Sequence, residues 1–467
     1  MGGTRSKKAL VVRNVALPQI NYKEMRTMNI TPKLTRDKLE TAIAKFQEIS
    51  WLFSKDPSSD FTRDRKLPLG SLLRLLLKFS GKSLQSEISA YYLSPKKTPP
   101  RIPTKSAFIQ QRQKILWEGF YYLLRSFTDS LPFLKLFNGY RLLACDGSTV
   151  PLPHNENEAK YLVVTKEDRK SYNQMHINTL YDIMNRLYVD CIIDPGMHMN
   201  ERAAMLKMVH RLDNVSKDIL LADRGYNGFN DTAHLLESGI KFVLREKDLD
   251  TNGIPHALKL PFDGEFDIDV DKKLTCNRSR KYANDDSYVR VNPDRFDFIN
   301  DPTDIYRIQF RLVRIKLNNG SYECLVTNLP RDQFPPEKMK KLYHLRWGIE
   351  NAYRDLKYPV DLLHFHGKSA QAVLQELFCS LIMFNFSAYI CVHADVLHRA
   401  KGTKYRYKVN FANAVGPCRS YLHGSIDESE LLDRLRLAPS PIRPDRYVPR
   451  PSHLKTQRSR EFNYRAS

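Results

Sequence analysis

Cysteine and long apolar runs are both scarce in this chain. Seven cysteines are scattered among 467 residues without a Cys-x-x-Cys pair, so we expect neither a disulfide framework nor a cysteine-based zinc site. The most apolar stretch, residues 378–392, contains Asn385 and is shorter than the ~18–20 residues that a membrane span requires. The opening residues, MGGTRSKKALVVRN, show no secretory signal. These absences predict a cytoplasmic protein without a membrane partner.

Acidic residues are few relative to basic ones. Lys and Arg number 74 and Asp and Glu 52, which gives a formal net charge of +22. The excess lies at the two ends, because residues 1–140 hold 25 basic against 10 acidic residues and residues 401–467 hold 14 against 6. An excess of this size favours a polyanionic partner such as nucleic acid, although solvated surface lysines give the same composition. We expect the ends to bind phosphates and the near-neutral centre to hold carboxylate chemistry.

The first 140 residues predict a helical domain. From residue 33 onward, apolar residues recur at three- and four-residue spacing between polar or proline-rich breaks. Thr104 can cap a single helix over residues 107–127 that carries Arg112 and Lys114. Short helices with basic, glutamine-rich faces are typical of helix-turn-helix regions, so Arg112 and Lys114 are candidate DNA contacts. An ordinary helical bundle is the alternative.

The middle of the chain predicts an α/β fold. Three strands, a helix, a strand, a helix and a strand follow one another over residues 141–245, which is typical of a mixed sheet. Apolar and polar residues then alternate without clear helices, and helical periodicity returns later. We therefore divide the chain into a helical DNA-binding domain (1–140), the first part of an α/β core (141–245), a β-rich insertion (246–335), the second part of the core (336–400) and a loosely ordered basic tail that contacts a partner or DNA (401–467).

Two aspartates of the predicted core follow apolar segments. Asp146 and Asp223 each follow an apolar strand, and sites in open α/β sheets form beyond the carboxyl ends of strands. Two neighbouring carboxylates repel each other unless a cation lies between them, and hard oxygen ligands favour Mg²⁺ or Mn²⁺ over zinc. Arg224, beside Asp223, is a candidate ligand of a phosphate or a carboxylate. A turn or cap role is the alternative for either aspartate.

A third acid, Glu350, lies in a predicted helix. Tyr343, Arg346, Glu350 and Lys357 fall on one narrow stripe of an ideal helix. Such a stripe is not typical of a core face, and it places two cations and a phenol beside one carboxylate. A metal-bound phosphodiester needs this combination, since the cations bind non-bridging oxygens and the carboxylate binds metal. The alternative is a solvated helix with an Arg346–Glu350 pair, worth only ~0.3–0.5 kcal/mol.

These motifs carry a family resemblance. The segment YHLRWGIENAYRDLK matches the Y-x2-R-x3-E-x6-K signature around the catalytic glutamate of DDE transposases of the insertion-sequence-four family. The segments LLACDGSTVPLP around Asp146 and ILLADRGYNG around Asp223 also resemble that family. So does the order of the two aspartates, a β-rich insertion and then Glu350. The resemblance spans about residues 141–395.

The resemblance implies a ribonuclease-H-like core interrupted by the β-rich insertion. Asp146, Asp223 and Glu350 would hold two Mg²⁺ ions per active site, with Mn²⁺ as a substitute, for phosphodiester hydrolysis and strand transfer. Tyr343, Arg346 and Lys357 would contact phosphates near the cleaved transposon end. Family members cut double-stranded DNA at inverted terminal repeats and join the ends to target DNA, typically as homodimers in a paired-end complex. A nucleoid-associated cytoplasmic location follows.

One feature departs from the best-studied relatives. Those proteins stack an extruded base on a Trp of the insertion while a DNA hairpin forms, whereas none of the three Trp of this chain lies in residues 246–335. Tyr288, Phe296 or Tyr306 could stack instead. Two other functions remain as alternatives: a ribonuclease-H-like nuclease of repair or recombination, and an inactivated transposase that only binds DNA.

Overall fold

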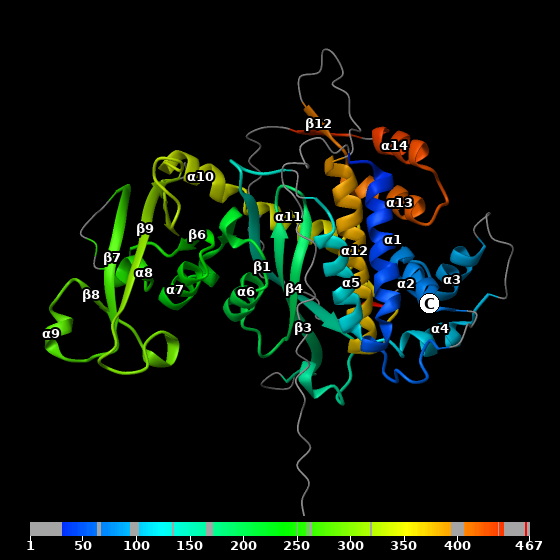
Figure 1. The fold of residues 1–467 in the computed structure, drawn as a ribbon, viewed down its shortest axis with the longest axis horizontal. Helices are drawn as coiled ribbons and strands as arrows, with labels where there is room; N and C mark the ends of the chain where they lie inside the picture. Colours follow the sequence, from blue (N-terminus) through cyan, green and yellow to red (C-terminus); the bar gives the residue numbers. More distant parts are fainter. Residues whose placement is uncertain are drawn as a thin grey trace, which may run out of the picture.

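A ten-stranded mixed sheet runs through the molecule, and a bundle of helices packs at one end of it (Figure 1). The computed structural model describes residues 30–62, 67–93, 102–132, 135–164, 171–249, 251–258, 260, 264–317, 320–393, 406–437, 439–442 and 463–464. Residues 1–29 lie outside this part of the chain. The mixed sheet with helices on its faces confirms the predicted α/β class.

The first half of the sheet is built from strands of the predicted core. The strands of the whole sheet are β1 (Arg141–Leu152), β2 (Leu162–Val163), β3 (Tyr172–Asp182), β4 (Leu187–Pro195), β5 (Asp218–Ala222), β6 (Lys241–Glu246), β7 (Phe266–Thr275), β8 (Tyr288–Arg290), β9 (Tyr306–Lys316) and β10 (Tyr322–Thr327). Their order is β2-β3-β1-β5-β6-β10-β9-β7-β8, and β4 also pairs with β3. β1 runs antiparallel to β3 and parallel to β5, and β5 runs parallel to β6. The carboxyl ends of β1 and β5 therefore point the same way.

Helices cover both faces of this half-sheet. Leu143 and Cys145 pack on one face with residues of α6 (Glu201–Val209) and α7 (Phe229–Glu237). Ala144 packs on the opposite face with residues of α11 (Trp347–Lys357). α10 (Pro336–His344) contributes Met339 and Leu342 to a third apolar cluster. Alternate residues of β1 thus face two different helical layers, as the two-residue period of a strand requires.

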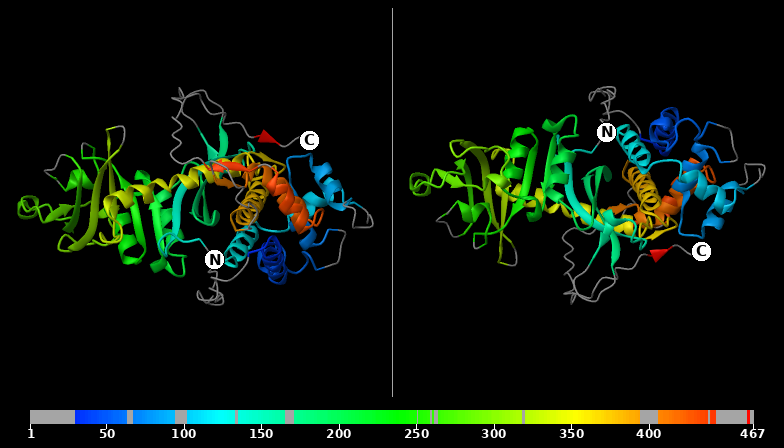
Figure 2. Two further views of the ribbon diagram at one scale, coloured as in Figure 1. Left: turned by 90° about the horizontal axis from the view of Figure 1, so that it is seen from above. Right: turned by 90° about the horizontal axis from the view of Figure 1, so that it is seen from below.

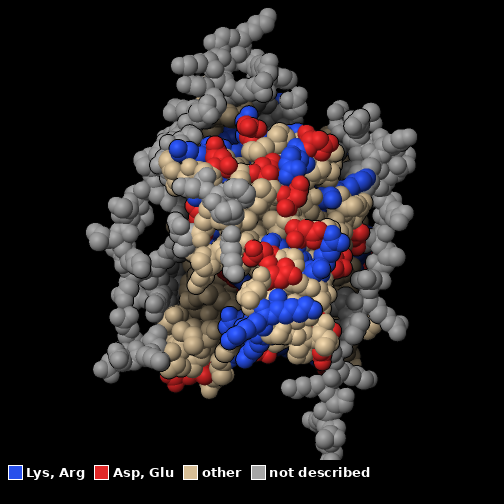
Figure 3. Space-filling view, turned by 90° about the vertical axis from the view of Figure 1, so that its left-hand side faces the viewer, with Lys and Arg blue, Asp and Glu red and all other residues tan. Residues whose placement is uncertain are grey.

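The predicted insertion is a continuation of the core sheet. β10 pairs antiparallel with β6 and with β9, and β9 pairs antiparallel with β7. The expected all-β block also contains two short helices, α8 (Ile254–Ala257) and α9 (Arg280–Ala283). Its exposed end carries charges of both signs (Figure 3), some of them paired across strands, as between Arg307 and Asp271. The views from above and below show the strands of this end following those of the core (Figure 2).

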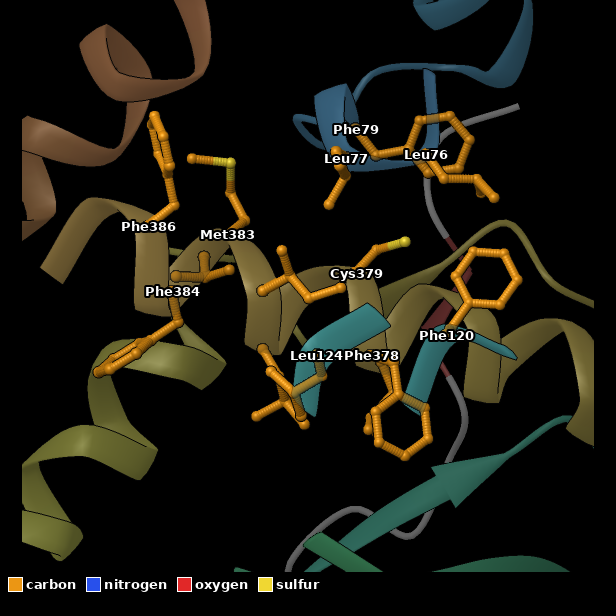
Figure 4. Close-up of a cluster of buried hydrophobic side chains, with 14 of the residues drawn as sticks. Leu76, Leu77, Phe79, Phe120, Leu124, Phe378, Cys379, Met383, Phe384 and Phe386 are labelled. Atoms are coloured by element: carbon orange, nitrogen blue, oxygen red, sulfur yellow. The ribbon is translucent and has the colours of Figure 1, made fainter. Parts of the chain in front are cut away.

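α12 (Ala370–His393) is the axis of the helical bundle (Figure 4). The bundle also contains α1 (Pro32–Glu48), α2 (Leu69–Lys78), α3 (Leu84–Tyr92), α4 (Lys105–Arg112), α5 (Trp117–Asp129), α13 (Phe411–Leu422) and α14 (Glu428–Arg436). One hydrophobic core unites side chains of α1, α2 and α5 with those of β1, β3 and α11 to α13. Asn385 is satisfied inside this core, because its amide donates to the carbonyl of Tyr188 at 2.9 Å and accepts from the Tyr188 N–H at 2.8 Å.

α12 is long and apolar enough to cross a membrane by length and composition. Its 24 residues exceed the apolar run seen in the sequence, but 94% of its most apolar window is buried against the rest of the protein. A helix that is apolar all round is typical of a buried core helix as well as of a membrane span. The burial indicates the core helix.

The single helix predicted over residues 107–127 is wrong. α4 ends at Arg112 and α5 begins at Trp117. The segment between them pairs with residues far away in the sequence: Lys55 donates its N–H to the carbonyl of Lys114, and Leu116 donates to that of Phe53, both at 2.8 Å. These backbone bonds replace helical ones, so the helix is interrupted.

The tail is more ordered than predicted. α13 and α14 lie within it, and Val415 and Cys418 of α13 are buried in the bundle core. The remaining short elements are β11 (His364–Phe365) with β14 (Asn463–Tyr464), β12 (Arg406–Lys408) with β13 (Ser440–Ile442), and the 3-10 turns η2 (Ser50–Phe53), η3 (Ala159–Tyr161), η4 (Val215–Lys217), η5 (Arg224–Tyr226) and η6 (Pro293–Arg295). The proline- and arginine-rich segment 443–462 lies outside the described residues.

Candidate active site

Asp146 is a partly buried carboxylate in the middle of β1. Its Oδ1 accepts the N–H of Gly147 at 2.9 Å. Burial raises the pKa of Asp146 to about 6, and the negative charges of Asp223 and Glu350 contribute to the increase. The positive charge of Arg346 acts in the opposite direction. The three acids that the sequence singles out therefore lie close enough for their charges to interact.

Asp223 follows β5 directly and caps a 3-10 turn. Its Oδ1 accepts the N–H of Gly225 at 2.8 Å, which fixes the carboxylate over η5. β5 is the parallel neighbour of β1, with Ala144 opposite Leu221. The two strands are parallel neighbours, as expected, and Asp223 directly follows β5; Asp146, however, lies within β1, which continues to Leu152.

Glu350 comes from α11, which lies along β1. Two contacts hold the helix there: the Tyr353 hydroxyl donates to the carbonyl of Asp146 at 3.0 Å, and Lys357 Nζ donates to Ser148 Oγ at 2.7 Å. The Tyr353 oxygen is also 2.8 Å from Thr179 Oγ1, so Thr179 is the donor of that second bond. These bonds determine how far Glu350 stands from the strand that carries Asp146.

The signature residues do not form the exposed stripe that the sequence predicts. α10 ends at His344 and α11 begins at Trp347, so the expected continuous helix is interrupted within the signature. Tyr343 is 3% exposed, and its hydroxyl has no hydrogen-bond partner among the described residues. Arg346 is 5% exposed and donates through Nη2 to Glu350 Oε1 at 2.7 Å. Tyr343 and Arg346 thus lie beneath the site, with Glu350 nearer the surface.

The donor set fits a divalent cation chemically. Asp146, Asp223 and Glu350 offer hard carboxylate oxygens, and burial, with a smaller contribution from the other two acids, raises the pKa of Asp146. Within the described part of the chain, no three His, Cys, Asp or Glu side chains already enclose a common point. One of the three carboxylates, Glu350, is already paired with the Arg346 guanidinium at 2.7 Å.

The other predicted DNA contacts lie in different environments. Arg224 is exposed in η5, next to Asp223. Lys114 is half-buried and lies 3.3 Å from Asp60 Oδ1. Arg112 is 3% exposed and is paired with Glu376 at 2.7 Å inside the helical bundle. The prediction that Arg112 contacts DNA is therefore corrected, because burial keeps its guanidinium away from any phosphate.

Sequence reasoning missed three residues near the site, namely Tyr353, Glu201 and His176. Tyr353 lies three positions after Glu350, so it faces the same side of a helix, and this spacing was the only signal available for it. Glu201 appears in the sequence as an ordinary helix start. His176 is one residue of an apolar strand. Their proximity to the aspartates becomes visible only in the folded chain.

Removing the Tyr353 hydroxyl should loosen the site. We expect Tyr353→Phe to lower the free energy of unfolding by ~1 kcal/mol, because buried Thr179 and the Asp146 carbonyl each lose a hydrogen bond. Chemical denaturation measures this change. Tyr358→Phe is the matched control, since Tyr358 lies on the same segment but is 68% exposed. Equal stability of the two variants would contradict the proposed bond.

Comparison with known proteins identifies the class. The sequence model of the Transposase DDE domain family matches residues 137–386, which is more than half of the chain. The chain therefore belongs to this family, and it is a DDE-type DNA transposase. Enzymes of this class generally use divalent metal ions.

Two further comparisons concern solved structures and curated proteins. The fold is similar to that in a cryo-EM structure of a piggyBac transposase synaptic complex with hairpin DNA, with a TM-score of 0.43 and 12% sequence identity. That alignment covers 89% of this chain and 84% of the other. No curated protein matches the chain.

Proposed function

We propose that this transposase belongs to the insertion-sequence-four group. In this proposal it cleaves DNA at the inverted terminal repeats of an insertion sequence and joins the ends to target DNA. The observation that carries the proposal is structural: Asp146 and Asp223 lie on or directly after neighbouring parallel strands, and Glu350 lies on α11, which is bonded to β1 at Asp146. The strand order β4-β3-β1-β5-β6, in which β3 alone runs against its neighbours, supports a ribonuclease-H-like core.

Asp146, Asp223 and Glu350 would hold two Mg²⁺ ions, with Mn²⁺ as a substitute. When bound, such ions supply an activated water or 3′-hydroxyl and stabilisation of the leaving oxygen. Asp146 must be ionised to serve as a ligand, so its raised pKa limits activity in acid solution. Arg346 is paired with Glu350 in the protein alone, and because its side chain is buried it would meet a DNA phosphate only after the site rearranges.

Lys357 and Arg224 are the proposed phosphate contacts nearest the carboxylates. Arg224 is exposed, and Lys357 reaches the strand that carries Asp146 through Ser148. Lys114 and the basic ends of the chain would extend this contact along the DNA. Tyr343 and Arg346 lie deeper, so they would act on DNA through the shape of the site or after rearrangement.

Lys357→Ala should weaken binding of transposon ends. The lost phosphate contact should flatten the log–log dependence of the binding constant on salt by ~0.9. Gel-shift titrations at several salt concentrations measure the slope. Lys217→Ala is the control, because Lys217 is exposed at the opposite end of β5 from Asp223. An unchanged slope for Lys357→Ala would remove this residue from the DNA contacts.

The remaining parts of the proposal concern assembly. A homodimer would hold two transposon ends in one paired-end complex in the nucleoid, and the 1–140 region would contribute DNA binding. A basic composition favours this role, since residues 1–140 carry 25 Lys and Arg against 10 Asp and Glu. Whether excision passes through a hairpin depends on an aromatic residue of the insertion. Tyr288 is half-buried there, whereas Phe296 is 2% exposed and Tyr306 bonds to Glu237.

A plasmid cleavage assay tests the proposed function. The DNA that flanks the coding region is sequenced for short inverted repeats, and a supercoiled plasmid carrying these repeats is incubated with protein and Mg²⁺. Cleavage at the repeats, followed by joining to a second plasmid, is the expected result. Cleavage without end specificity would favour the nuclease, and binding without cleavage would favour the inactivated transposase.

A further inference from the structure

A fourth carboxylate, Glu201, lies near the loop that carries Asp223, on the opposite face of β1 from Asp146. Glu201 is the first residue of α6, whose N-cap is Asn200. Its side chain is 35% exposed, so it is reachable from solvent. α6 lies on the opposite face of the sheet from α11. Glu201 therefore approaches the site from the side that Glu350 does not occupy.

His176 lies beneath Glu201. The imidazole lies on β3 opposite Thr149 of β1, and its side chain is 5% exposed. His176 Nε2 is 2.9 Å from Glu201 Oε1, yet neither ring nitrogen makes a well-directed hydrogen bond to any described residue. A buried imidazole without such bonds is costly. Its position against Glu201 indicates a role other than packing.

Two glycines make room for this pair. A Cβ atom on Gly147 would come within 2.3 Å of His176 Nε2 and 2.5 Å of Glu201 Oε1. A Cβ atom on Gly225 would lie 3.1 Å from Asp223 Oδ1 and 4.0 Å from Glu201 Oε2. One oxygen of Glu201 thus faces His176, and the other faces the loop of Asp223. Gly147 and Gly225 follow Asp146 and Asp223 closely in the sequence, so the pair sits between the two aspartate segments.

The next residue of α6 fastens the same loop. Arg202 Nε donates to the carbonyl of Gly225 at 2.9 Å, and Arg202 Nη1 lies 3.3 Å from Asp231 Oδ2. Two consecutive side chains at the start of α6 therefore approach residues 223–225. This arrangement is more specific than an acidic residue placed at a helix N-terminus, which interacts with the helix dipole alone.

We propose that Glu201, which lies against His176, is a positioning residue of the transposase that helps to retain a hydrated divalent cation at Asp223. The inference rests on the proposed function of Asp146, Asp223 and Glu350 as cation ligands. Glu201 would act from outside the ligand set: Oε1 lies 2.9 Å from His176 Nε2, and Oε2, which faces the loop of Asp223, would accept hydrogen bonds from water bound to the cation. Outer-shell groups of this kind fix the ligands and tune the affinity of metal sites.

Glu201→Gln tests the inference first through cation binding and then through the Mn²⁺ dependence of cleavage. Calorimetric titration of the metal-free protein with Mn²⁺ is expected to give a ~10-fold weaker dissociation constant than for the natural protein. In plasmid cleavage, the Mn²⁺ concentration that gives half-maximal rate should rise by a similar factor, with a smaller fall in the maximal rate. His176→Gln should change the Mn²⁺ affinity in the same direction, because it frees Glu201.

Glu337→Gln is the matched control. Glu337 is an exposed acid in the first turn of α10, so its substitution removes a helix-dipole interaction similar to that of Glu201. Thermal melting verifies that each variant folds. If Glu201→Gln does not fold, Glu201→Asp replaces it, because the shorter carboxylate keeps the charge and withdraws the oxygen from the loop; weaker Mn²⁺ binding is expected for it too.

The inference would be overturned if the Glu201 variant that folds bound Mn²⁺ as tightly as Glu337→Gln does. Failure of the proposed function has a different signature, namely unchanged Mn²⁺ binding and cleavage in Asp146→Asn.

Discussion

Asp146→Asn is expected to abolish strand cleavage, with a loss of at least ~10³-fold in rate, while binding to transposon ends is retained. The amide keeps the shape of the side chain but removes a charged cation ligand. The loss corresponds to the several kcal/mol that a metal site contributes to stabilising charge in the transition state. Supercoiled-plasmid cleavage in Mg²⁺ and gel shifts on the same ends measure the two activities separately.

The same variant should be more stable than the natural protein in the absence of metal. Burial and neighbouring negative charges raise the pKa of Asp146 from 3.8 to about 6, so the ionised carboxylate destabilises the fold. The stability associated with its protonated form is complete below pH ~4 and is lost as the pH rises through about 6. At pH 8 in EDTA, Asn is expected to recover part of a limit of ~3 kcal/mol, reduced by solvent access.

Asp332→Asn is the control for both measurements, since Asp332 is exposed before α10. It should change neither cleavage nor the pH dependence of unfolding. Persistent cleavage by Asp146→Asn would exclude Asp146 as a metal ligand. Activity lost together with stability, at every pH, would instead indicate that Asp146 maintains the structure.

Arg112→Met is expected to destabilise the protein by ~3–5 kcal/mol, because it leaves Glu376 as a buried charge without its partner. The two side chains are 4% and 3% exposed, with Arg112 Nη1 2.7 Å from Glu376 Oε1. Arg112 Nε also donates to Gln375 Oε1 at 3.0 Å, and Nη2 donates to the carbonyl of Ala372 at 2.7 Å. All three bonds fasten α4 to α12. Denaturant unfolding gives the change directly.

The neighbouring cation provides the comparison. Lys114→Ala removes a half-buried ion pair with Asp60, so a change of only ~0–1 kcal/mol is expected. Replacing Glu376 by Leu in the Arg112→Met background should restore much of the stability, because the unpaired charge is removed. If the Arg112→Met protein unfolds at the same denaturant concentration as the natural protein but no longer binds DNA, the original prediction that Arg112 contacts DNA would be reinstated.

The position of Asp146 shows what sequence reasoning can reach. The apolar run before Asp146 predicts its strand, and the apolar run before Asp223 predicts the parallel neighbour β5, so chain order and strand physics suffice. The strands of the core and the turn before β4 were also predictable, since period-two apolar patterns and a tight turn are local features. Arg186 occupies the left-handed region in that turn, with φ of 57°.

The failures share a physical cause, which is dependence on distant partners. Arg112 resembles a surface cation until Glu376, 264 positions away, is brought beside it. The break between α4 and α5 follows from backbone bonds to residues 53–55. Glu201 reaches Gly147 and Gly225 only after α6 folds back over the sheet. None of these contacts leaves a periodic or compositional trace in the sequence.

α12 has a consequence for incomplete copies of the gene product. Its apolar surface is covered by helices that precede it and follow it in the sequence, from α1 to α13. A polypeptide that stops soon after residue 393, or that begins beyond residue 131, lacks some of these helices. It would expose an apolar helix whose length and composition are those of a membrane-spanning helix. Fragments of this transposase are therefore expected to aggregate or to be degraded, and not to persist as competitors of the intact enzyme.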